Sequence, residues 1–146
     1  MAQIIAVDPG DEHVGIALWR NGILRGAVTV DNQEAMREIY QVARLREAGP
    51  SVTLVVESFV LYPWVATEQT WSPMLTAQMI GALKWEAEVG GYKFVEQGAD
   101  IKKPTERQAV ARGLRHMGKS RHAKDAELHL WYYCLRNAIP MDEEAK

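Results

Sequence analysis

Two acidic residues stand at the ends of short apolar segments, where a charge is unusual. Asp8 follows the segment 3–7 and precedes Pro9-Gly10, and Glu57 directly follows Leu54-Val55-Val56. Each residue alone has an ordinary interpretation: Asp8 could satisfy amides in a turn, and Glu57 could be a strand-end glutamate exposed to water. A carboxylate beside a buried strand is costly unless something pairs with it. Two of them at the ends of two predicted strands therefore indicate a site.

A third acidic residue, Asp125, lies three positions after His122, at the start of a helix predicted over 123–137. Side chains three residues apart occupy neighbouring positions on one face of a helix. The adjoining apolar stripe must pack on a sheet, and it consists of Leu128, Trp131, Tyr132 and Leu135. Asp125 is therefore expected at the border between core and solvent. On its own, it could equally be a surface aspartate near a basic neighbour, and His122 a surface histidine.

Three carboxylates and a histidine brought together would have a specific chemistry. Oxygen ligands are what hard divalent cations such as magnesium prefer, and magnesium keeps several waters when it is bound. Two such ions about 4 Å apart can activate an attacking water and stabilise the leaving oxygen of a phosphodiester. If helix packing brings His122 and Asp125 to the strand ends that carry Asp8 and Glu57, the sequence predicts a metal-dependent site for phosphodiester hydrolysis.

The segment 98–124 is locally basic in a chain whose formal net charge is −2. Its acidic residues are Asp100 and Glu106, and its basic residues are Lys102, Lys103, Arg107, Arg112, Arg115, Lys119, Arg121 and Lys124. Such a run could be the solvated face of a helix. It could also be a surface that contacts the phosphates of a nucleic acid. The sequence leaves both interpretations open.

The elements that would position these residues begin with three strands. The segments 3–7, 14–19 and 23–30 predict strands, and Asn21-Gly22 favours a tight hairpin because both residues tolerate positive φ. A helix is predicted over 33–48, and a strand buried on both faces over 52–56. A strand, a helix and a further strand in this order imply a parallel crossover.

The second half of the chain alternates in the same way. An aromatic segment, 59–72, precedes a helix predicted over 74–89, and a short strand follows over 92–95. Thr105 is predicted to cap a helix over 105–116, before the final helix. The order of elements predicts an α/β fold with a meander of three strands at its start. The sequence contains no internal repeat.

Length and composition fit one compact domain over residues 1–146 that folds alone or as a dimer. The chain is 47% hydrophobic and 25% charged, which is ordinary for a globular protein. Cys134 is the only cysteine, which excludes an intrachain disulfide and a cysteine-rich zinc site. The start of the sequence lacks the layout of a secretory signal, and no stretch approaches the roughly 18 apolar residues of a membrane span. We therefore expect a cytoplasmic protein without a membrane partner, bacterial or in the host cytoplasm if phage-encoded.

Three motifs, in this order, resemble the RuvC Holliday junction resolvases: IAVDPGDEHVGIALW, VVESF and HAKDAELHLWYY. The matching order covers nearly the whole chain, from residue 3 to about residue 135. The resemblance implies a ribonuclease H-like fold, a five-stranded mixed sheet flanked by helices, and is compatible with a phage-type member. It also implies a homodimer acting on branched DNA, in which each subunit nicks one strand of a four-way junction symmetrically. The hydrolysis would be assisted by magnesium or manganese.

The same resemblance assigns roles to the four residues singled out above. Asp8 matches the metal ligand on the first strand, and Glu57 matches the carboxylate that ends the fourth strand. His122 and Asp125 match the acidic or histidine pair on the last helix. By this resemblance Asp8 would bridge two ions per active site, and Glu57 and Asp125 would each hold one. His122 would bind or orient a metal or the attacking water.

The resemblance also implies DNA contacts and a dimer helix. Phe59 falls where the family has an aromatic residue, and it could stack on an unpaired base or lie in the core. Lysines near the end of the fifth strand would neutralise phosphates and make binding salt-dependent. The candidate DNA-binding residues are Phe59, Lys102, Lys103, Arg107, Lys119 and Arg121. The helix over 74–89 corresponds to the dimer helix, and its candidates for the interface or for the core are Met79, Leu83 and Trp85.

Departures from the family pattern keep other functions open. The loop after Lys102 is shorter than in the family, and its second lysine has no clean counterpart, Arg107 being the nearest candidate. The aromatic segment and the net acidity also depart from the pattern. A broader branched-DNA or flap nuclease, a nuclease for RNA–DNA hybrids or single strands, and a catalytically idle DNA-binding module remain alternatives. An actin-like ATPase also begins with Asp-Pro-Gly and a hairpin, but it needs two lobes, which 146 residues cannot supply.

Overall fold

The centre of the chain is a mixed sheet, which a computed structural model describes over residues 2–43, 51–60 and 74–143. Strands β1 (Gln3–Asp8), β2 (His13–Arg20) and β3 (Ile23–Asp31) form the predicted antiparallel meander. Asn21 and Gly22 join β2 to β3 at φ values of 52° and 90°, so the expected tight hairpin is confirmed. Helix α1 (Asn32–Ala43) leads to β4 (Val52–Glu57), which pairs parallel with β1. The predicted crossover is therefore present.

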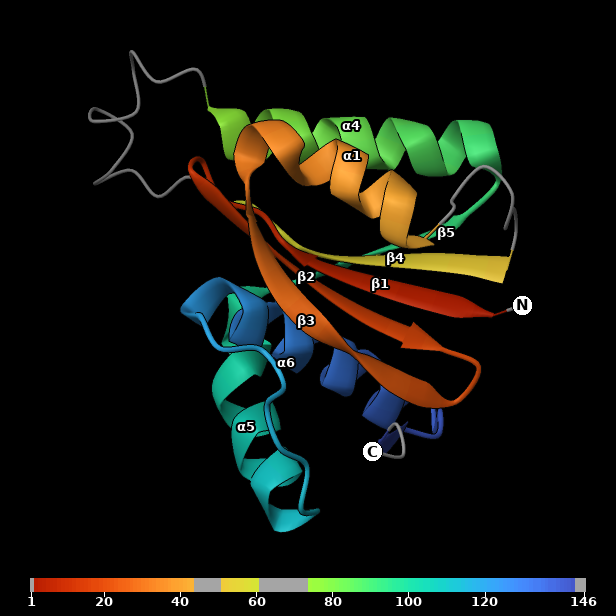
Figure 1. Cartoon of the computed structure of the whole chain (residues 1–146), viewed down its shortest axis with the longest axis vertical. Coiled ribbons are helices and arrows are strands. Elements are labelled where there is room, and N and C mark those ends of the chain that lie inside the picture. Colours follow the sequence, from red (N-terminus) through yellow and green to blue (C-terminus); the bar gives the residue numbers. More distant parts are fainter. Residues whose placement is uncertain (1, 44–50, 61–73, 144–146) are drawn as a thin grey trace.

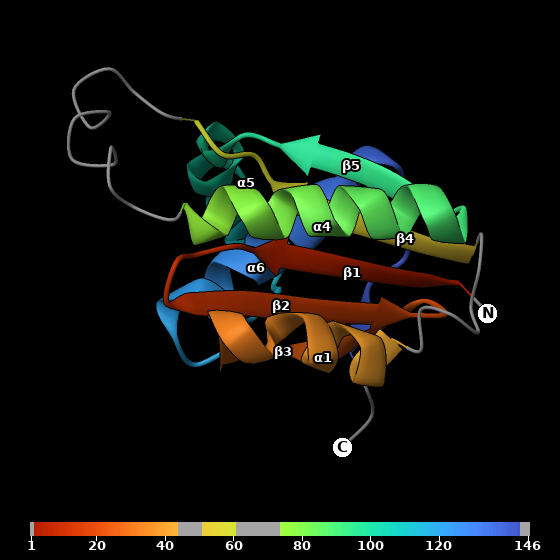
Figure 2. The same ribbon diagram turned by 90° about the horizontal axis from the view of Figure 1, so that it is seen from above.

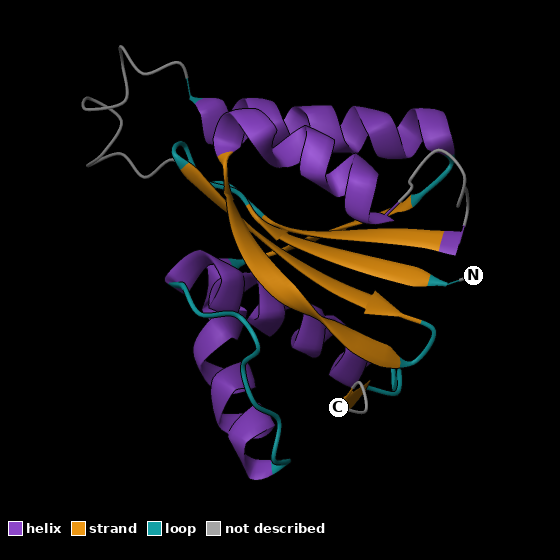
Figure 3. Cartoon of the chain, in the orientation of Figure 1, coloured by secondary structure: helices purple, strands orange, loops and turns teal. Residues whose placement is uncertain are grey.

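Later elements extend the sheet on both edges (Figure 3). Helix α4 (Leu75–Gly90) precedes β5 (Lys93–Gln97), which pairs parallel with β4. A 3₁₀ turn, η2 (Ala99–Ile101), continues into α5 (Lys102–Ala111), and α6 (Arg121–Arg136) follows. A two-residue strand, β6 (Asp142–Glu143), pairs with β3. The strand order β5-β4-β1-β2-β3-β6 contains the five predicted strands and adds this short edge strand.

Helices cover both faces of the sheet (Figures 1 and 2). All six residues of β1 are buried, because alternate side chains enter two separate cores. Ile5 and Val7 pack in the core under α1 and α4, whereas Ile4 and Ala6 pack in the core with α6. This arrangement confirms the predicted ribonuclease H-like architecture. No helix of the described residues is long and apolar enough to cross a membrane.

The helix after β5 begins and ends earlier than predicted. It starts at Lys102 because η2 runs directly into it, so the prediction that Thr105 caps the helix is wrong. Thr105 is buried inside the helix, and its hydroxyl donates to the carbonyl oxygen of Ile101 at 2.7 Å. The helix ends at Ala111, close to Gly113 at φ 78°, a left-handed conformation that glycine favours.

Two of the three residues of α4 left open between a dimer interface and the core lie in the core. Met79 and Leu83 are buried against the sheet, so the core alternative is confirmed for both. Trp85 is exposed. The helix predicted over 33–48 is described as far as Ala43. Most of the aromatic segment predicted over 59–72 lies outside the described residues, which do not include 61–73.

Candidate active site

Asp8 and Glu57 lie beside each other at the carboxyl ends of two parallel strands. In the register of β1 and β4, Val7 pairs with Val56, so the next residues along the two strands are Asp8 and Glu57. The Asp8 side chain is buried and that of Glu57 is partly buried. The sheet itself therefore places two carboxylates together in a poorly solvated position.

A glycine lets α6 approach β2 closely enough to reach the same strand ends. A Cβ atom on Gly15 would lie 1.9 Å from the carbonyl oxygen of His122, so only glycine permits this backbone contact. Ser120 fixes the start of the helix: its hydroxyl hydrogen-bonds with Thr29 of β3 and caps the first turn of α6. The first turn, with His122 and Asp125, thereby packs at the ends of the strands.

The resulting group of side chains, here termed the carboxylate cluster, consists of Asp8, Glu57, Asp125, His122 and Lys102. His122 Nδ1 lies 2.9 Å from Asp8 Oδ2. Lys102 Nζ lies 3.3 Å from Glu57 Oε2 and 3.1 Å from Asp125 Oδ2. The structure brings together the four residues expected in a catalytic set. Lys102, expected only as a DNA contact, lies among them.

The burial of Asp8 perturbs its acidity. Burial raises the pKa of Asp8 from its ordinary 3.8 to about 6. The hydrogen bond with His122 opposes this rise, and the charges of Glu57 and Asp125 add to it. The Asp8 carboxylate therefore carries its charge at a free-energy cost that a nearby cation would reduce.

Glu57 and Lys102 are shifted in the directions that keep both groups charged. Burial would raise the pKa of Glu57, but the hydrogen bond with His129 and the charge of Lys102 outweigh it and lower the pKa. Burial would lower the pKa of Lys102, but the charge of Glu57 and the contact with Asp125 raise it. The cluster thus holds a permanent ammonium group and more acidic groups than this one cation balances.

His129 contacts the Glu57 carboxylate, and the sequence analysis did not single out this residue. This fully buried side chain of α6 places Nε2 2.8 Å from Glu57 Oε2 and Nδ1 2.9 Å from Gln97 Oε1. Gln97 ends β5, where the register pairs it with Glu57. An imidazole held at both nitrogens has a fixed ring orientation, and it directs the carboxylate that it contacts. A usable signal was the helical spacing, since His129 follows His122 by about two turns.

The donor atoms of the carboxylate cluster are of the type that binds hard divalent cations. Carboxylate oxygens with one imidazole suit magnesium or manganese. Within the described residues, no three His, Cys, Asp or Glu side chains are arranged as a metal-binding group. The Lys102 ammonium lies between Glu57 and Asp125 instead. Its position demonstrates that the cluster accommodates a cation between these carboxylates.

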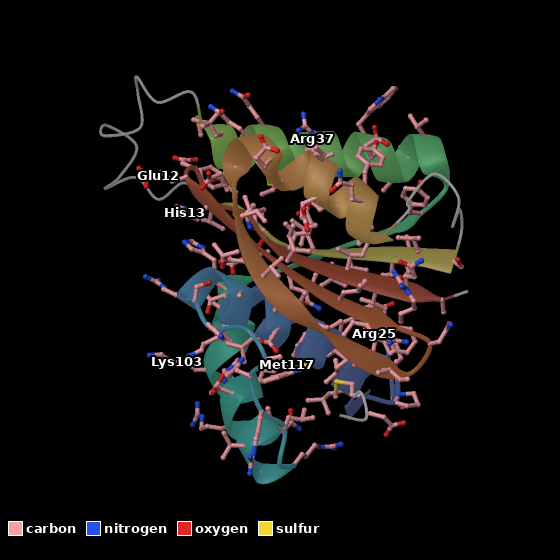
Figure 4. The ribbon with its side chains drawn as sticks, in the orientation of Figure 1. Glu12, His13, Arg25, Arg37, Lys103 and Met117 are labelled. Atoms are coloured by element: carbon pink, nitrogen blue, oxygen red, sulfur yellow. The ribbon has the colours of Figure 1, made fainter. Side chains whose placement is uncertain are left out.

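The candidate DNA-binding residues lie after β4, on α5 and near the start of α6. Phe59 follows β4 two residues after Glu57 and is 39% exposed, so of its two alternatives the one that places it in the core is wrong. Lys102 is partly buried within the cluster. The other four are exposed on α5 or near the start of α6: Lys103, Arg107, Lys119 and Arg121. Figure 4 labels Lys103 on α5. The four basic side chains are therefore accessible to solvent, as a contact with a polyanion would require.

The segment 112–120, between α5 and α6, is anchored by a buried carboxylate that the sequence did not reveal as special. Glu127 of α6 accepts hydrogen bonds from the amides of Met117 at 2.9 Å and Gly118 at 2.8 Å. His116 lies between two acidic residues, with Nδ1 3.2 Å from Glu127 and Nε2 2.9 Å from Glu106 of α5. These contacts fix the segment to the helix that carries part of the carboxylate cluster.

Comparison with known proteins identifies the fold. No protein-family model matches the sequence, and no curated protein sequence matches it either. Among solved structures, the chain is similar to T. thermophilus RuvC in complex with a Holliday junction substrate, with a TM-score of 0.58 and 16% identity. This match covers 95% of the present chain and 98% of the RuvC chain. A second structure of Thermus thermophilus RuvC has a TM-score of 0.58 and 19% identity, covering 94% and 97% of the two chains. The chain has the ribonuclease H-like fold of RuvC along nearly its whole length.

Proposed function

We propose that this chain is a structure-selective DNA endonuclease that resolves four-way junctions. The observation that carries the proposal is the carboxylate cluster at the adjacent ends of β1 and β4. It occurs in a fold shared with a protein whose solved complex contains a Holliday junction substrate. We further propose that residues 1–146 act as a single nuclease domain.

The residues of the carboxylate cluster have separable tasks in this proposal. Asp8 would hold two divalent cations, Glu57 and Asp125 would hold one each, and His122 would orient Asp8, which it contacts at 2.9 Å. Bound magnesium or manganese would supply the charge that activates a water and stabilises the leaving oxygen. Hydrolysis adds the water oxygen to phosphorus and breaks one phosphorus–oxygen bond, and the leaving oxygen takes up a proton.

Lys102 would contribute a positive charge to the same reaction. Its ammonium is held by Glu57 and Asp125, and its side chain is 23% exposed, so a ligand in solvent can reach this side chain. A phosphate entering the cluster would be a third acceptor for this ammonium. Lys103 and Arg107 on the exposed surface of α5 would hold the flanking phosphates, with a salt-dependent contribution to affinity.

Symmetric nicking would require two active sites, and we propose a homodimer for this purpose. The exposed apolar side chains of α4, Trp85 and Val89, are candidates for its interface. They lie four residues apart and hence on one face of the helix. Burial of this pair in a dimer would remove an apolar patch from water.

The decisive experiment is cleavage of a labelled four-way junction beside duplex, flap and single-stranded DNA. Each substrate is tested with magnesium, manganese or a chelator, and wild type is compared with Asp8→Asn. Asp142→Asn serves as a matched control, because Asp142 is exposed on the edge strand β6, which pairs with β3 on the side of the sheet opposite β5. We expect paired nicks at the junction that need metal and the Asp8 carboxylate and that the control retains.

Other outcomes of this experiment point to other functions. Equal cutting of flaps or single strands would keep the metal site and replace the junction specificity by a broader nuclease activity. Tight binding of junctions without cleavage under any metal would refute the nuclease proposal in favour of a DNA-binding module. Cleavage that survives Asp8→Asn would show that the carboxylate cluster is not the active site.

A further inference from the structure

A cavity of about 500 Å³ opens directly beside the carboxylate cluster and shares Glu57 with it. Residues following β4 and β5 and the first turn of α4 form its walls. Figure 2 shows the carboxyl end of β5 and the start of α4 at the same end of the sheet. The residues that matter for its chemistry are Ser58, Phe59, Val60, Thr76 and Asp100. The cavity has the size of a small-molecule site.

The apolar part of the lining is exposed. Phe59 is 39% exposed and Val60 is 56% exposed, although both follow a strand that is otherwise buried. A flat heterocycle could cover this surface, because an aromatic side chain offers a stacking face to any base. The apolar lining alone does not discriminate between bases.

The polar side chains of the cavity, by contrast, are restricted to accepting hydrogen bonds. The Ser58 hydroxyl donates its hydrogen to the Gln97 carbonyl oxygen at 3.3 Å. The Thr76 hydroxyl donates its hydrogen to Asp11 Oδ1 at 2.7 Å. Each hydroxyl has one hydrogen, so both oxygens can only accept from a ligand.

The Asp100 carboxylate is also an acceptor, and it is exposed at the start of η2. Among the described residues, none forms a hydrogen bond or ion pair with this carboxylate. An ionised carboxylate accepts hydrogen bonds and donates none. The free acceptor in the cavity therefore favours a ligand that presents N–H groups.

We propose that this cavity receives an unpaired nucleobase and that Asp100 selects a base with an exocyclic amine over thymine. Cytosine, adenine and guanine all carry an amino group that can donate to a carboxylate, and an acidic side chain accepting from cytosine N4 is a known mode of base recognition. Thymine has no amino group and presents a carbonyl oxygen where cytosine has its amine. A thymine in the cavity would therefore face Asp100 with an acceptor against an acceptor.

The occupant is a nucleic-acid base because of where the cavity lies. This part of the inference rests on the proposed function: a phosphate at the carboxylate cluster would place the adjoining nucleotide beside Glu57, at the mouth of the cavity. A carboxylate close to a DNA strand repels phosphates, so Asp100 weakens binding in general. Asp100 favours binding only of a strand whose base donates a hydrogen bond to it. For every other strand the repulsion between Asp100 and the phosphates is not offset, and this difference makes Asp100 a determinant of specificity.

The test uses four-way junctions randomised at the positions around the branch point. The bound fraction is isolated in chelator, the cleaved fraction is isolated in magnesium, and both are sequenced. Wild type is compared with Asp100→Asn, whose amide can also donate to thymine. The matched control is Glu88→Gln, which removes one negative charge from an exposed position near the other end of α4.

We expect at least one position at which wild type disfavours thymine by about tenfold, within the range given by one specific base contact. Asp100→Asn should lose this discrimination in the same fraction, and Glu88→Gln should retain it. The inference is overturned if neither fraction shows such a position, or if the preference persists in Asp100→Asn. Failure of the proposed function gives a different result: no cleaved product forms in magnesium. The base preference can then still be measured in the bound fraction isolated in chelator.

Discussion

Replacement of Asp8 by asparagine should stabilise the protein in the absence of divalent cations, although it removes a proposed catalytic group. Burial raises the pKa of Asp8 from 3.8 to about 6. At about 1.4 kcal/mol for each pKa unit, the ionised carboxylate lowers the free energy of unfolding by about 3 kcal/mol at neutral pH. Asparagine has nearly the same shape and no charge, and its oxygen can still accept the 2.9 Å hydrogen bond from His122.

The pH dependence of this effect has a definite sign. Because the pKa of Asp8 is higher in the folded protein, the stability from the protonated carboxyl is fully present below about pH 3.8. It is lost as the pH rises through about 6. The gain from Asp8→Asn should therefore be largest above pH 7 and small near pH 4. In thermal denaturation with chelator at pH 8, this gain in the free energy of unfolding corresponds to an increase in Tm of roughly 5–10 °C.

Thermal denaturation of wild type, Asp8→Asn and the control Asp142→Asn at pH 4, 6 and 8 would check this reasoning. Manganese added at pH 8 should raise the Tm of wild type and have little effect on Asp8→Asn, since a ligand stabilises only the state that binds it. A variant that is no more stable than wild type at pH 8 in chelator would refute the account of Asp8. So would a gain of equal size at all three pH values.

Substitutions at three further residues probe how the site is assembled. Gly15→Ala should destabilise the protein by about 1–3 kcal/mol, measured by urea denaturation, and abolish junction cleavage. The added Cβ would lie 1.9 Å from the carbonyl oxygen of His122 and would therefore displace the His122 backbone. His129→Phe should weaken manganese binding by about 10- to 100-fold in calorimetry, and His129→Gln should restore part of it, because Glu57 loses its orienting partner. Lys102→Gln should tighten manganese binding and slow cleavage, because it removes the ammonium that competes for Glu57; unchanged metal affinity would contradict that competition.

The pairing of Asp8 with Glu57 could be predicted because it depends on local patterns. Each residue ends an apolar segment, and a parallel crossover between the two segments places their ends side by side. The hairpin at Asn21-Gly22 was predictable for a similar reason, since the conformations of its two residues decide it.

The partners of these carboxylates depend on contacts that sequence patterns do not specify. Lys102 was predicted as a phosphate contact, but the early start of α5 turns it toward Glu57 and Asp125. His129 lies in a helix whose neighbours are apolar, so its type alone fits a core residue as well as a partner for Glu57. Its role depends on Gln97 of an edge strand, 32 positions away in the sequence.

The distribution of charge reconciles a net charge of −2 with the proposed binding to DNA. Eight of the 17 basic residues fall within 98–124, whereas the three carboxylates of the cluster are buried or partly buried. Exposed charges further apart than the Debye length, about 8 Å at physiological salt, interact weakly, so the net charge of the chain does not set the local field. In the proposed function, a phosphate approaching the site would meet the basic residues of α5 and the start of α6 first.

Within the cluster itself the ammonium of Lys102 balances only one of the three carboxylates. A divalent cation there would reduce the same repulsion that raises the pKa of Asp8 and would make the site attractive to a phosphodiester. The electrostatic cost of the folded apo protein and its proposed catalytic competence therefore have one origin, the burial of acidic groups at the ends of β1 and β4.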